Sequence, residues 1–507
     1  MAVNQLKVGA LLSYVVLILN NIVGLAYTPF MLRMMGQSEY GLYSLVASVI
    51  AYLTILDFGF GNAIIRYTSK FRAQGKLDEQ FSMFGMFIVL YSVIGVIAFI
   101  AGLCLYYNVD SMFGKTMTIE ELGKAKIMML LMVFNIAFTF PLSIFGAIIT
   151  AYEDFIFQRI IQIVRIILNT GVMILLLTIG YKAIAIVVVT TVFNLITLLI
   201  NYFYCRYKIK IKIYFHKVDW SFLKEVALYS FYIFLSMIMD RIYWGTGQFI
   251  LGMYVGTAAI AIFSIAISLQ NMYMSFSASI ANVFLPKITK MITEGQSEKT
   301  ISDLFIKTGR IQFIIISFVL VGFIIFGEQF VILWAGKSYV EAYIITLLFF
   351  IPLTVPLIQT VGITILQARN QMKFRSLLYI GIAFCSLGLQ FLLAKKYGGI
   401  GVGIGISSGL LLGQIIIMNI YYYKKQKIDI PYFWKEIAKM SIVPLVLGVS
   451  VYYLSIFFII NTIIDLFIGI VLFSIAYIPL FWIFSMNKFE KDLFGGPLKK
   501  LFLRMRR

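Results

Sequence analysis

Long apolar runs, separated by short clusters of charged residues, fill this 507-residue chain from one end to the other. A run of about 20 apolar residues is long enough for an α-helix to cross the hydrocarbon core of a bilayer. The pattern therefore predicts an all-α polytopic membrane protein with about fourteen transmembrane helices. The expected helices span residues 8–32, 41–65, 82–107, 127–150, 158–180, 183–204, 226–254, 258–285, 311–335, 341–367, 376–394, 400–423, 437–459 and 462–485.

The composition agrees with a chain whose solvent is mostly lipid. Hydrophobic residues make up 61% of the chain, charged residues make up 13%, and the mean hydropathy is +0.95. These values exclude an ordinary soluble protein. The first apolar run, 8–32, is too long for the core of a signal peptide and lacks a cleavage site of small residues, so we expect a retained helix.

Lys and Arg residues are distributed unevenly over the gaps between the apolar runs. The gaps on the side of the N-terminus, together with the C-terminal tail, hold 32 of the 42 basic residues, and the alternate gaps hold 8. Cytoplasmic loops of membrane proteins carry the excess of positive charge, so both termini are expected in the cytoplasm. The net charge of +20 then faces anionic lipid headgroups, and no nucleic-acid partner is expected.

Residues with metal-binding or catalytic chemistry are scarce. Cys104, Cys205 and Cys385 fall at different expected depths, and the single histidine, His216, lies in a basic loop. This spacing does not support a zinc site, a disulfide framework or histidine-based catalysis. We therefore expect no catalytic residues, no metal and no cofactor.

The two halves of the chain resemble each other in sequence. Residues 30–34 (FMLRM) match residues 249–253 (FILGM) at an offset of 219, and Ser48–Ser268 and Asn62–Asn282 continue the match at 220. Six helices separate the matched segments, which predicts two parallel repeats. The expected domains are two six-helix lobes around a central cavity, 1–216 and 217–430, and a third segment, 431–507, with two extra helices and a basic tail. Two such lobes can support alternating access, although a duplication that only packs is the alternative reading.

Polar residues within the apolar runs indicate where a cavity lies. Asp240 and Arg241 fall near the middle of 226–254, and a charged side chain in lipid costs a few kcal/mol unless it faces water or a partner. The repeat places Asn21 at the depth of Asp240. The residues expected to bind substrate in this cavity are Arg241, Arg165, Asn20, Asn21, Tyr243, Trp244, Asn271 and Gln162. Asp240 either couples transport to an ion or compensates the charge of Arg241.

Two further patterns have both a functional and a structural interpretation. Asp57 and Arg66 flank the glycine-containing end of 41–65 and are expected at a cytoplasmic gate without substrate contact. In the expected helix 258–285, one face carries Ser264, Ser268, Asn271, Ser275, Ser279 and Asn282. That face either lines the cavity or packs closely against another helix.

The run PFMLRMMGQSEYGLYSL, followed by ILDFGFGNAIIRYTSKFRAQGK, resembles the N-terminal signature of bacterial polysaccharide-biosynthesis flippases. That family lies in the superfamily of multidrug, oligosaccharidyl-lipid and polysaccharide exporters. The resemblance implies a flippase rather than an enzyme, in the bacterial cytoplasmic membrane, that carries polyprenyl-pyrophosphate-linked oligosaccharides to the outer leaflet. It also implies coupling to H⁺, Na⁺ or the membrane potential, and polysaccharide-biosynthesis enzymes as partners. The planar guanidinium of arginine suits the phosphate oxygens of such a substrate.

Two other functions remain open at this point. A cation-coupled multidrug extruder would share the fold, although its cavity should be more acidic and carry fewer amides. A glycan polymerase or a membrane scaffold belongs to another class. The short expected outer loops argue against a polymerase but not against a scaffold.

Overall fold

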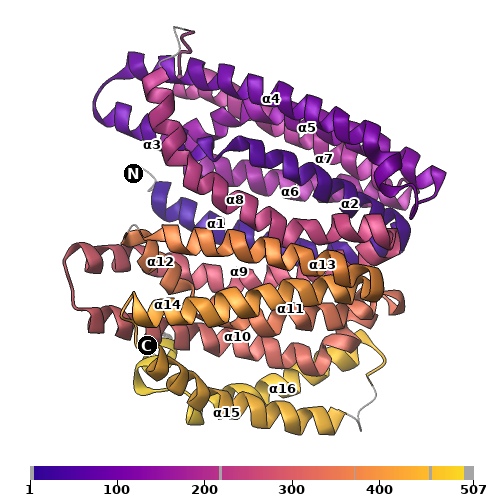
Figure 1. Cartoon of the computed structure of the whole chain (residues 1–507), viewed down its shortest axis with the longest axis vertical. Helices are drawn as coiled ribbons and strands as arrows, with labels where there is room; N and C mark the ends of the chain where they lie inside the picture. Colours follow the sequence, from indigo (N-terminus) through magenta and orange to yellow (C-terminus); the bar gives the residue numbers. More distant parts are fainter. Residues whose placement is uncertain (1–4, 216–219, 370, 456–459, 496–507) are drawn as a thin grey trace, which may run out of the picture. The chain divides into compact units, whose positions relative to one another are not determined.

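The computed structural model describes residues 5–215, 220–369, 371–455 and 460–495, and these ranges form α-helices joined by short turns, without a β-strand (Figure 1). Twelve helical stretches in these ranges are long and apolar enough to cross a membrane. The all-α polytopic fold is thereby confirmed.

The count of fourteen transmembrane helices stays a prediction. The expected helix 226–254 lies within one continuous helix, α8 (Trp220–Tyr254), which is not among the twelve stretches. The expected pair 376–394 and 400–423 lies within a single stretch, Met372–Lys424, which Gly398 interrupts with φ 54°. In both cases helical segments lie where the sequence predicts them.

The chain folds into two compact units. Unit 1 comprises 1–264 with 394–399, and unit 2 comprises 265–393 with 400–507. Unit 1 continues past the repeat boundary expected at 216 because α8 packs against α2 (Gln37–Leu53) and α3 (Phe60–Ala73). The two units are defined by how the helices pack. The expected domains 1–216, 217–430 and 431–507 are defined by sequence repetition, so they remain predictions.

Unit 1 is built from three main helix pairs. α4 (Leu77–Phe113) packs along α5 (Ile119–Ala151), α5 packs along α7 (Ala183–Tyr204), and α1 (Gln5–Met35) packs along α6 (Phe155–Thr178). Figure 1 shows α4, α5 and α7 side by side. A Cβ added to Gly95 would lie 2.7 Å from the Ala137 carbonyl oxygen, so the absence of a side chain allows α4 to approach α5 closely.

The core of unit 1 is aromatic and lies between α3, α4 and α5. Phe84, Phe87 and Tyr91 of α4 are fully buried, and the Tyr91 ring stacks on Phe140 of α5 with centroids 6.2 Å apart. The segment that joins α2 to α3, the 3₁₀ turn η1 (Thr54–Asp57) and Phe58, rests on this core. The core therefore fixes the position of the bend between α2 and α3.

Unit 2 contains α10 (Glu298–Trp334), α11 (Glu341–Ile358), α12 (Thr360–Ala368) and α14 (Met418–Lys424), and most of α9 (Thr257–Thr293) and α13 (Met372–Gly409). α11 carries Pro352 and Pro356 and ends at Ile358, within the expected helix 341–367. The Ser277 hydroxyl of α9 donates to the Leu357 carbonyl oxygen at 2.7 Å. A neighbouring helix thus satisfies a carbonyl that the helix break releases.

The two expected extra helices are α15 (Ile430–Ser455) and α16 (Ile463–Phe484), and both pack against α10 in unit 2. Arg310 of α10 is buried and forms ion pairs with α15 and with the segment that follows α16. Its Nε donates to Glu490 Oε1 at 2.6 Å and its Nη1 to Glu436 Oε2 at 2.8 Å. Arg310 falls in the charged gap before the expected helix 311–335, so the sequence does not predict this cluster.

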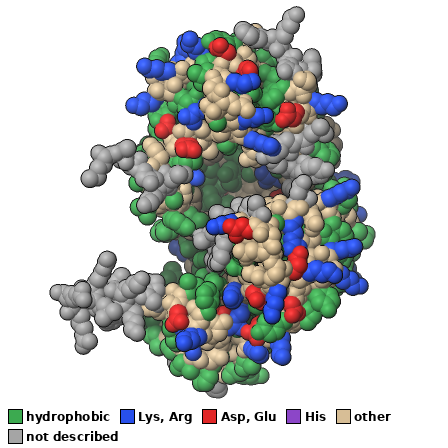
Figure 2. Space-filling view, turned by 90° about the vertical axis from the view of Figure 1, so that its left-hand side faces the viewer, with side chains coloured by type: hydrophobic (Ala, Val, Ile, Leu, Met, Phe, Trp, Pro, Cys, Tyr) green, Lys and Arg blue, Asp and Glu red, His purple; other side chains and the backbone are tan. Residues whose placement is uncertain are grey.

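Charged side chains gather at one end of each unit (Figure 2). In unit 1 the last turn of α3 carries Lys70 and Arg72, and the turn that follows carries Lys76. In unit 2 the turn after α14 carries Lys425 and Lys427. This is the arrangement that the positive-inside rule expects of a cytoplasmic end, and the cytoplasmic location of the termini remains a prediction.

Candidate functional site

Arg241 lies in α8 and contacts the bend between α2 and α3. Its Nη2 donates to Thr54 Oγ1 of η1 at 3.3 Å. Its carbonyl oxygen accepts a hydrogen bond from the Tyr52 hydroxyl at 3.3 Å, and that hydroxyl also lies 2.5 Å from Thr246 Oγ1. A guanidinium has five N–H donors. The side chain is half-buried, and Thr54 is its one hydrogen-bond partner within the described part of the chain.

The neighbours of Arg241 on α8 form a mixed polar and aromatic segment. Asp240 is exposed, and Tyr243 and Trp244 are half-buried. The Tyr243 and Trp244 rings meet edge to face, with centroids 5.1 Å apart and planes at 74°. Because successive helical residues diverge by about 100°, these side chains cover a broad sector of α8 rather than a single stripe.

The second candidate arginine, Arg165, lies in α6 and is half-buried. It has no hydrogen-bond or ion-pair partner among the residues described. One turn further along α6, the Asn169 Oδ1 atom is buried and unpartnered. Gln162 is engaged, because its Oε1 accepts from Arg159 Nη1 at 2.9 Å. An unpaired guanidinium beside an unpaired amide oxygen is an arrangement that can receive a polar ligand.

α1 carries the candidate amides Asn20 and Asn21 and packs against α6. The two helices pack closely, since a Cβ on Gly9 would lie 2.6 Å from Phe155 Cβ. Asn20 is exposed, whereas the Asn21 side chain donates to the Leu17 carbonyl oxygen of its own helix at 3.1 Å. Asn20 is therefore more accessible to a ligand than Asn21.

Asn271 belongs to a different unit from the other candidate residues. It is an exposed residue of α9 in unit 2, whereas all other candidate substrate residues belong to unit 1. On the same predicted face, Ser264 accepts from Gln248 Nε2 at 2.8 Å. The side chains of Ser279 and Asn282 lie outside the described residues. A substrate role for Asn271 stays a prediction.

Asp57 and Arg66, the residues expected at a gate, take different partners. Asp57 Oδ1 accepts from the Tyr91 hydroxyl at 2.6 Å. The Arg66 guanidinium carbon lies 5.7 Å from the centroid of the Tyr67 ring. Their role in gating stays a prediction.

The sequence does not predict which residues surround Asp57 and Arg241. Tyr52, Thr246 and Tyr91 lie within apolar runs, where a tyrosine or threonine gives no sign of a specific contact. The sequence gives only the spacing of these residues from Asp57 and Arg241, and spacing along the chain does not reveal which helices pack together.

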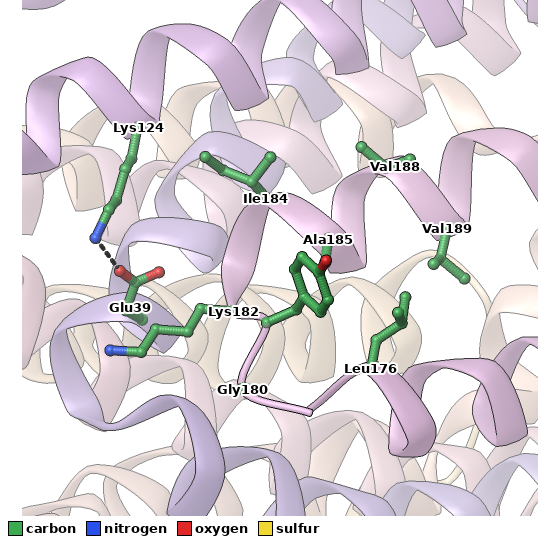
Figure 3. A pocket seen from close by; sticks show the side chains of 10 residues that line it. Glu39, Lys124, Leu176, Gly180, Lys182, Ile184, Ala185, Val188 and Val189 are labelled. Atoms are coloured by element: carbon green, nitrogen blue, oxygen red, sulfur yellow. Dashed lines mark hydrogen bonds and ion pairs between the residues drawn. The ribbon is translucent and has the colours of Figure 1, made fainter. Parts of the chain in front are cut away.

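A pocket of about 560 Å³ in unit 1 lies at the turn between α6 and α7 (Figure 3). Lys124 forms ion pairs there with Glu39 at 2.5 Å and with Glu120 at 2.7 Å. Leu176, Val188 and Val189 form part of the apolar wall. None of the predicted substrate residues lines this pocket, so it is separate from the α6 and α8 candidates.

The fold is that of a class of membrane transporters. The structure of the lipid II flippase MurJ in an inward-closed conformation has a TM-score of 0.71 at 17% identity, over 97% of this chain and 99% of that chain. An inward-facing multidrug resistance transporter of the MATE family scores 0.64 at 15% identity, over 82% and 99%. A MOP superfamily transporter from Pyrococcus furiosus scores 0.58 at 14% identity, over 83% and 96%.

The family of this chain follows from its sequence. The family model described as polysaccharide biosynthesis protein matches residues 6–292, more than half of the chain. The chain belongs to this family, which confirms the resemblance seen in the N-terminal signature. No curated protein matches the sequence.

Proposed function

We propose that this protein is a flippase for polyprenyl-pyrophosphate-linked oligosaccharides, moving them from the cytoplasmic to the outer leaflet of a bacterial cytoplasmic membrane. The observation that carries the proposal is the pair of arginines within helices of unit 1, Arg165 and Arg241. One has no partner among the described residues, and the other has a single, long hydrogen bond. Membership of the polysaccharide biosynthesis family and the fold shared with a lipid flippase support it.

In this proposal the arginines bind the pyrophosphate. A guanidinium offers a planar fork of N–H donors that matches phosphate oxygens, and its charge stays constant during transport. Transport of an anionic headgroup through the bilayer requires such compensation, because an isolated charge in hydrocarbon is costly. Asn20, Asn271, Tyr243 and Trp244 would contact the sugars through amides, hydroxyls and ring faces.

The remaining parts of the proposal concern energy and partners. The exposed carboxylate of Asp240 next to Arg241 would bind H⁺ or Na⁺ and so couple transport to an ion gradient. Alternating access of the two repeats would move the site between the membrane faces. Enzymes that assemble and consume lipid-linked oligosaccharides are the expected partners.

Transport in reconstituted vesicles tests the proposal. Arg241→Ala and Arg165→Ala should each slow the flipping of a polyprenyl-pyrophosphate oligosaccharide by about tenfold or more, because one charge-assisted contact is worth about 1.5–3 kcal/mol. Arg241→Lys keeps the charge without the planar fork and should retain intermediate activity. Arg33→Ala, at an exposed position outside the candidate site, is the matched control and should transport at the parent rate.

The result can also contradict the proposal. If both alanine variants flip the substrate at the rate of the parent, the arginines do not bind it. If the parent protein moves organic cations and does not flip the oligosaccharide lipid, the protein is a multidrug extruder rather than a flippase.

A further inference from the structure

The bend between α2 and α3 is a break in the helix at a defined place. α2 ends at Leu53, η1 continues to Asp57, and α3 begins at Phe60. The two residues between them adopt left-handed conformations, Phe58 with φ 51° and Gly59 with φ 73°. Such a conformation is unfavourable for a residue with a side chain, so the surroundings of Phe58 must hold it in place.

Asp57 is the last residue of η1, and its carboxylate is held by a neutral partner. Asp57 is half-buried, and its Oδ1 accepts a hydrogen bond of 2.6 Å from Tyr91, a fully buried residue of α4. Within the described chain Asp57 forms no ion pair. A carboxylate that is removed from water without a cation is stabilised by binding a proton.

Apart from Tyr91, no charged or titratable group described on the surrounding helices bonds to Asp57. From α8, Arg241 reaches the bend but donates to Thr54, and Asp240 is exposed. From α2, Tyr52 bonds Thr246 and the Arg241 carbonyl oxygen. From α3, Arg66 lies over the Tyr67 ring. From α4, the group facing Asp57 is the Tyr91 hydroxyl.

The expected second repeat has a polar contact near the corresponding position, without an ionisable acid. Ser277 follows Asp57 by 220 positions, the offset that also relates Ser48 to Ser268, and Gln312 follows Tyr91 by 221. The Gln312 amide lies 3.1 Å from the Ser277 hydroxyl, and both residues are buried in unit 2. A neutral pair therefore meets the packing requirement at this position, so packing alone does not call for an acid at Asp57.

We infer that Asp57 is a proton-binding site of unit 1 and that its protonation acts on the bend between α2 and α3. The described residues contain no group of three or more acidic, histidine or cysteine side chains of the kind that holds a transition metal ion. A carboxylate only accepts hydrogen bonds, whereas a carboxylic acid also donates one. Protonation therefore changes the contact with Tyr91 that ties the bend to α4.

The bend also contacts α8, so that a change at Asp57 can alter the position of residues in the candidate site. The Phe58 ring stacks on Phe234 of α8 with centroids 4.5 Å apart, and Thr54 accepts from Arg241. A rearrangement at Asp57 shifts the segment that holds both contacts. The inference concerns proton binding and does not depend on which substrate the protein carries.

Infrared difference spectroscopy of the purified full-length protein tests this inference. Lowering the pH from about 8 to about 5, a range that includes perturbed carboxyl groups, should produce the C=O stretch of a protonated carboxylic acid. Asp57→Asn should remove one component of this band. Tyr91→Phe should keep the component and shift its frequency, because the carboxyl loses its hydrogen-bond partner. Ser277→Ala, the matched change in the second repeat, should leave the band unchanged.

The outcomes separate this inference from the proposed function. Loss of the component in Asp57→Asn supports it even if no oligosaccharide lipid is transported. An unchanged band in a folded Asp57→Asn protein, verified by its circular dichroism, overturns it. A component that disappears on adding NaCl at constant pH, with KCl as the control, also overturns it, because Na⁺ would then occupy the carboxylate.

Discussion

At the scale of single residues, Arg310 shows what a buried charge requires of its surroundings. It is 5% exposed and is bound by Glu490, itself 1% exposed, and by Glu436. Burying three charges is costly, and the ion pairs offset the cost only because all members are hydrogen-bonded. Loss of one partner leaves an uncompensated charge within the contact between α10, α15 and α16.

We therefore expect Arg310→Met to destabilise the folded protein by about 3–5 kcal/mol, the usual effect of breaking a buried pair. Lys439→Ala removes an exposed pair with the same Glu436 and should change the free energy of unfolding by less than about 1 kcal/mol. Thermal or denaturant unfolding in detergent measures both variants. Equal effects of the two substitutions would show that the cluster does not hold α15 and α16 on α10.

Arg241 and Arg165 could be found from sequence because a charged residue within an apolar run is conspicuous at any depth. Tyr91 could not be recognised as the partner of Asp57, since tyrosines are frequent in membrane helices and most of them are structural. In the same way, the sequence places Arg310 in an expected loop, because it lies in a charged part of its helix.

At the scale of elements, the bend between α2 and α3 depends on Gly59. At φ 73° a side chain is strained, whereas Gly61 lies in α3 without a positive φ and with open space around its Cβ position. Gly59→Ala should therefore destabilise the protein by about 1 kcal/mol. Gly61→Ala should be neutral or stabilising by up to about 1 kcal/mol, because alanine favours a helix.

Unfolding of both glycine variants in one detergent provides the measurement. A stable Gly59→Ala protein would mean that the bend can straighten at no cost, contrary to the geometry of Phe58 and Gly59. The glycines at the end of the expected helix 41–65 are visible in the sequence, whereas the positive φ of Phe58 is not.

At the scale of the whole molecule, the distribution of basic residues predicts the orientation in the membrane. Both termini and the end of α3 that carries Lys70 are expected in the cytoplasm, and the turn containing Lys115 is expected outside. Lys70→Cys and Lys115→Cys test this in a protein whose three native cysteines, Cys104, Cys205 and Cys385, have been replaced. An impermeant thiol reagent added to intact cells should label position 115 and spare position 70.

Labelling of position 70 and protection of position 115 would reverse the orientation and with it the direction of transport that we propose. Membrane permeabilisation is the control, because it should make both positions reactive. This experiment is independent of substrate identity and of the arginine variants.

The sequence by itself determined the polytopic helical class, the approximate places of the helices and the family. These properties are local: a membrane helix satisfies its own backbone hydrogen bonds, and its apolar length is visible in any window of about 20 residues. Only the tertiary structure decided which side chains meet. Asp57 and Tyr91 are 34 positions apart, Arg310 and Glu490 are 180 apart, and Thr54 and Arg241 are 187 apart. Helix packing brings these residues together, and no periodicity along the chain encodes that packing.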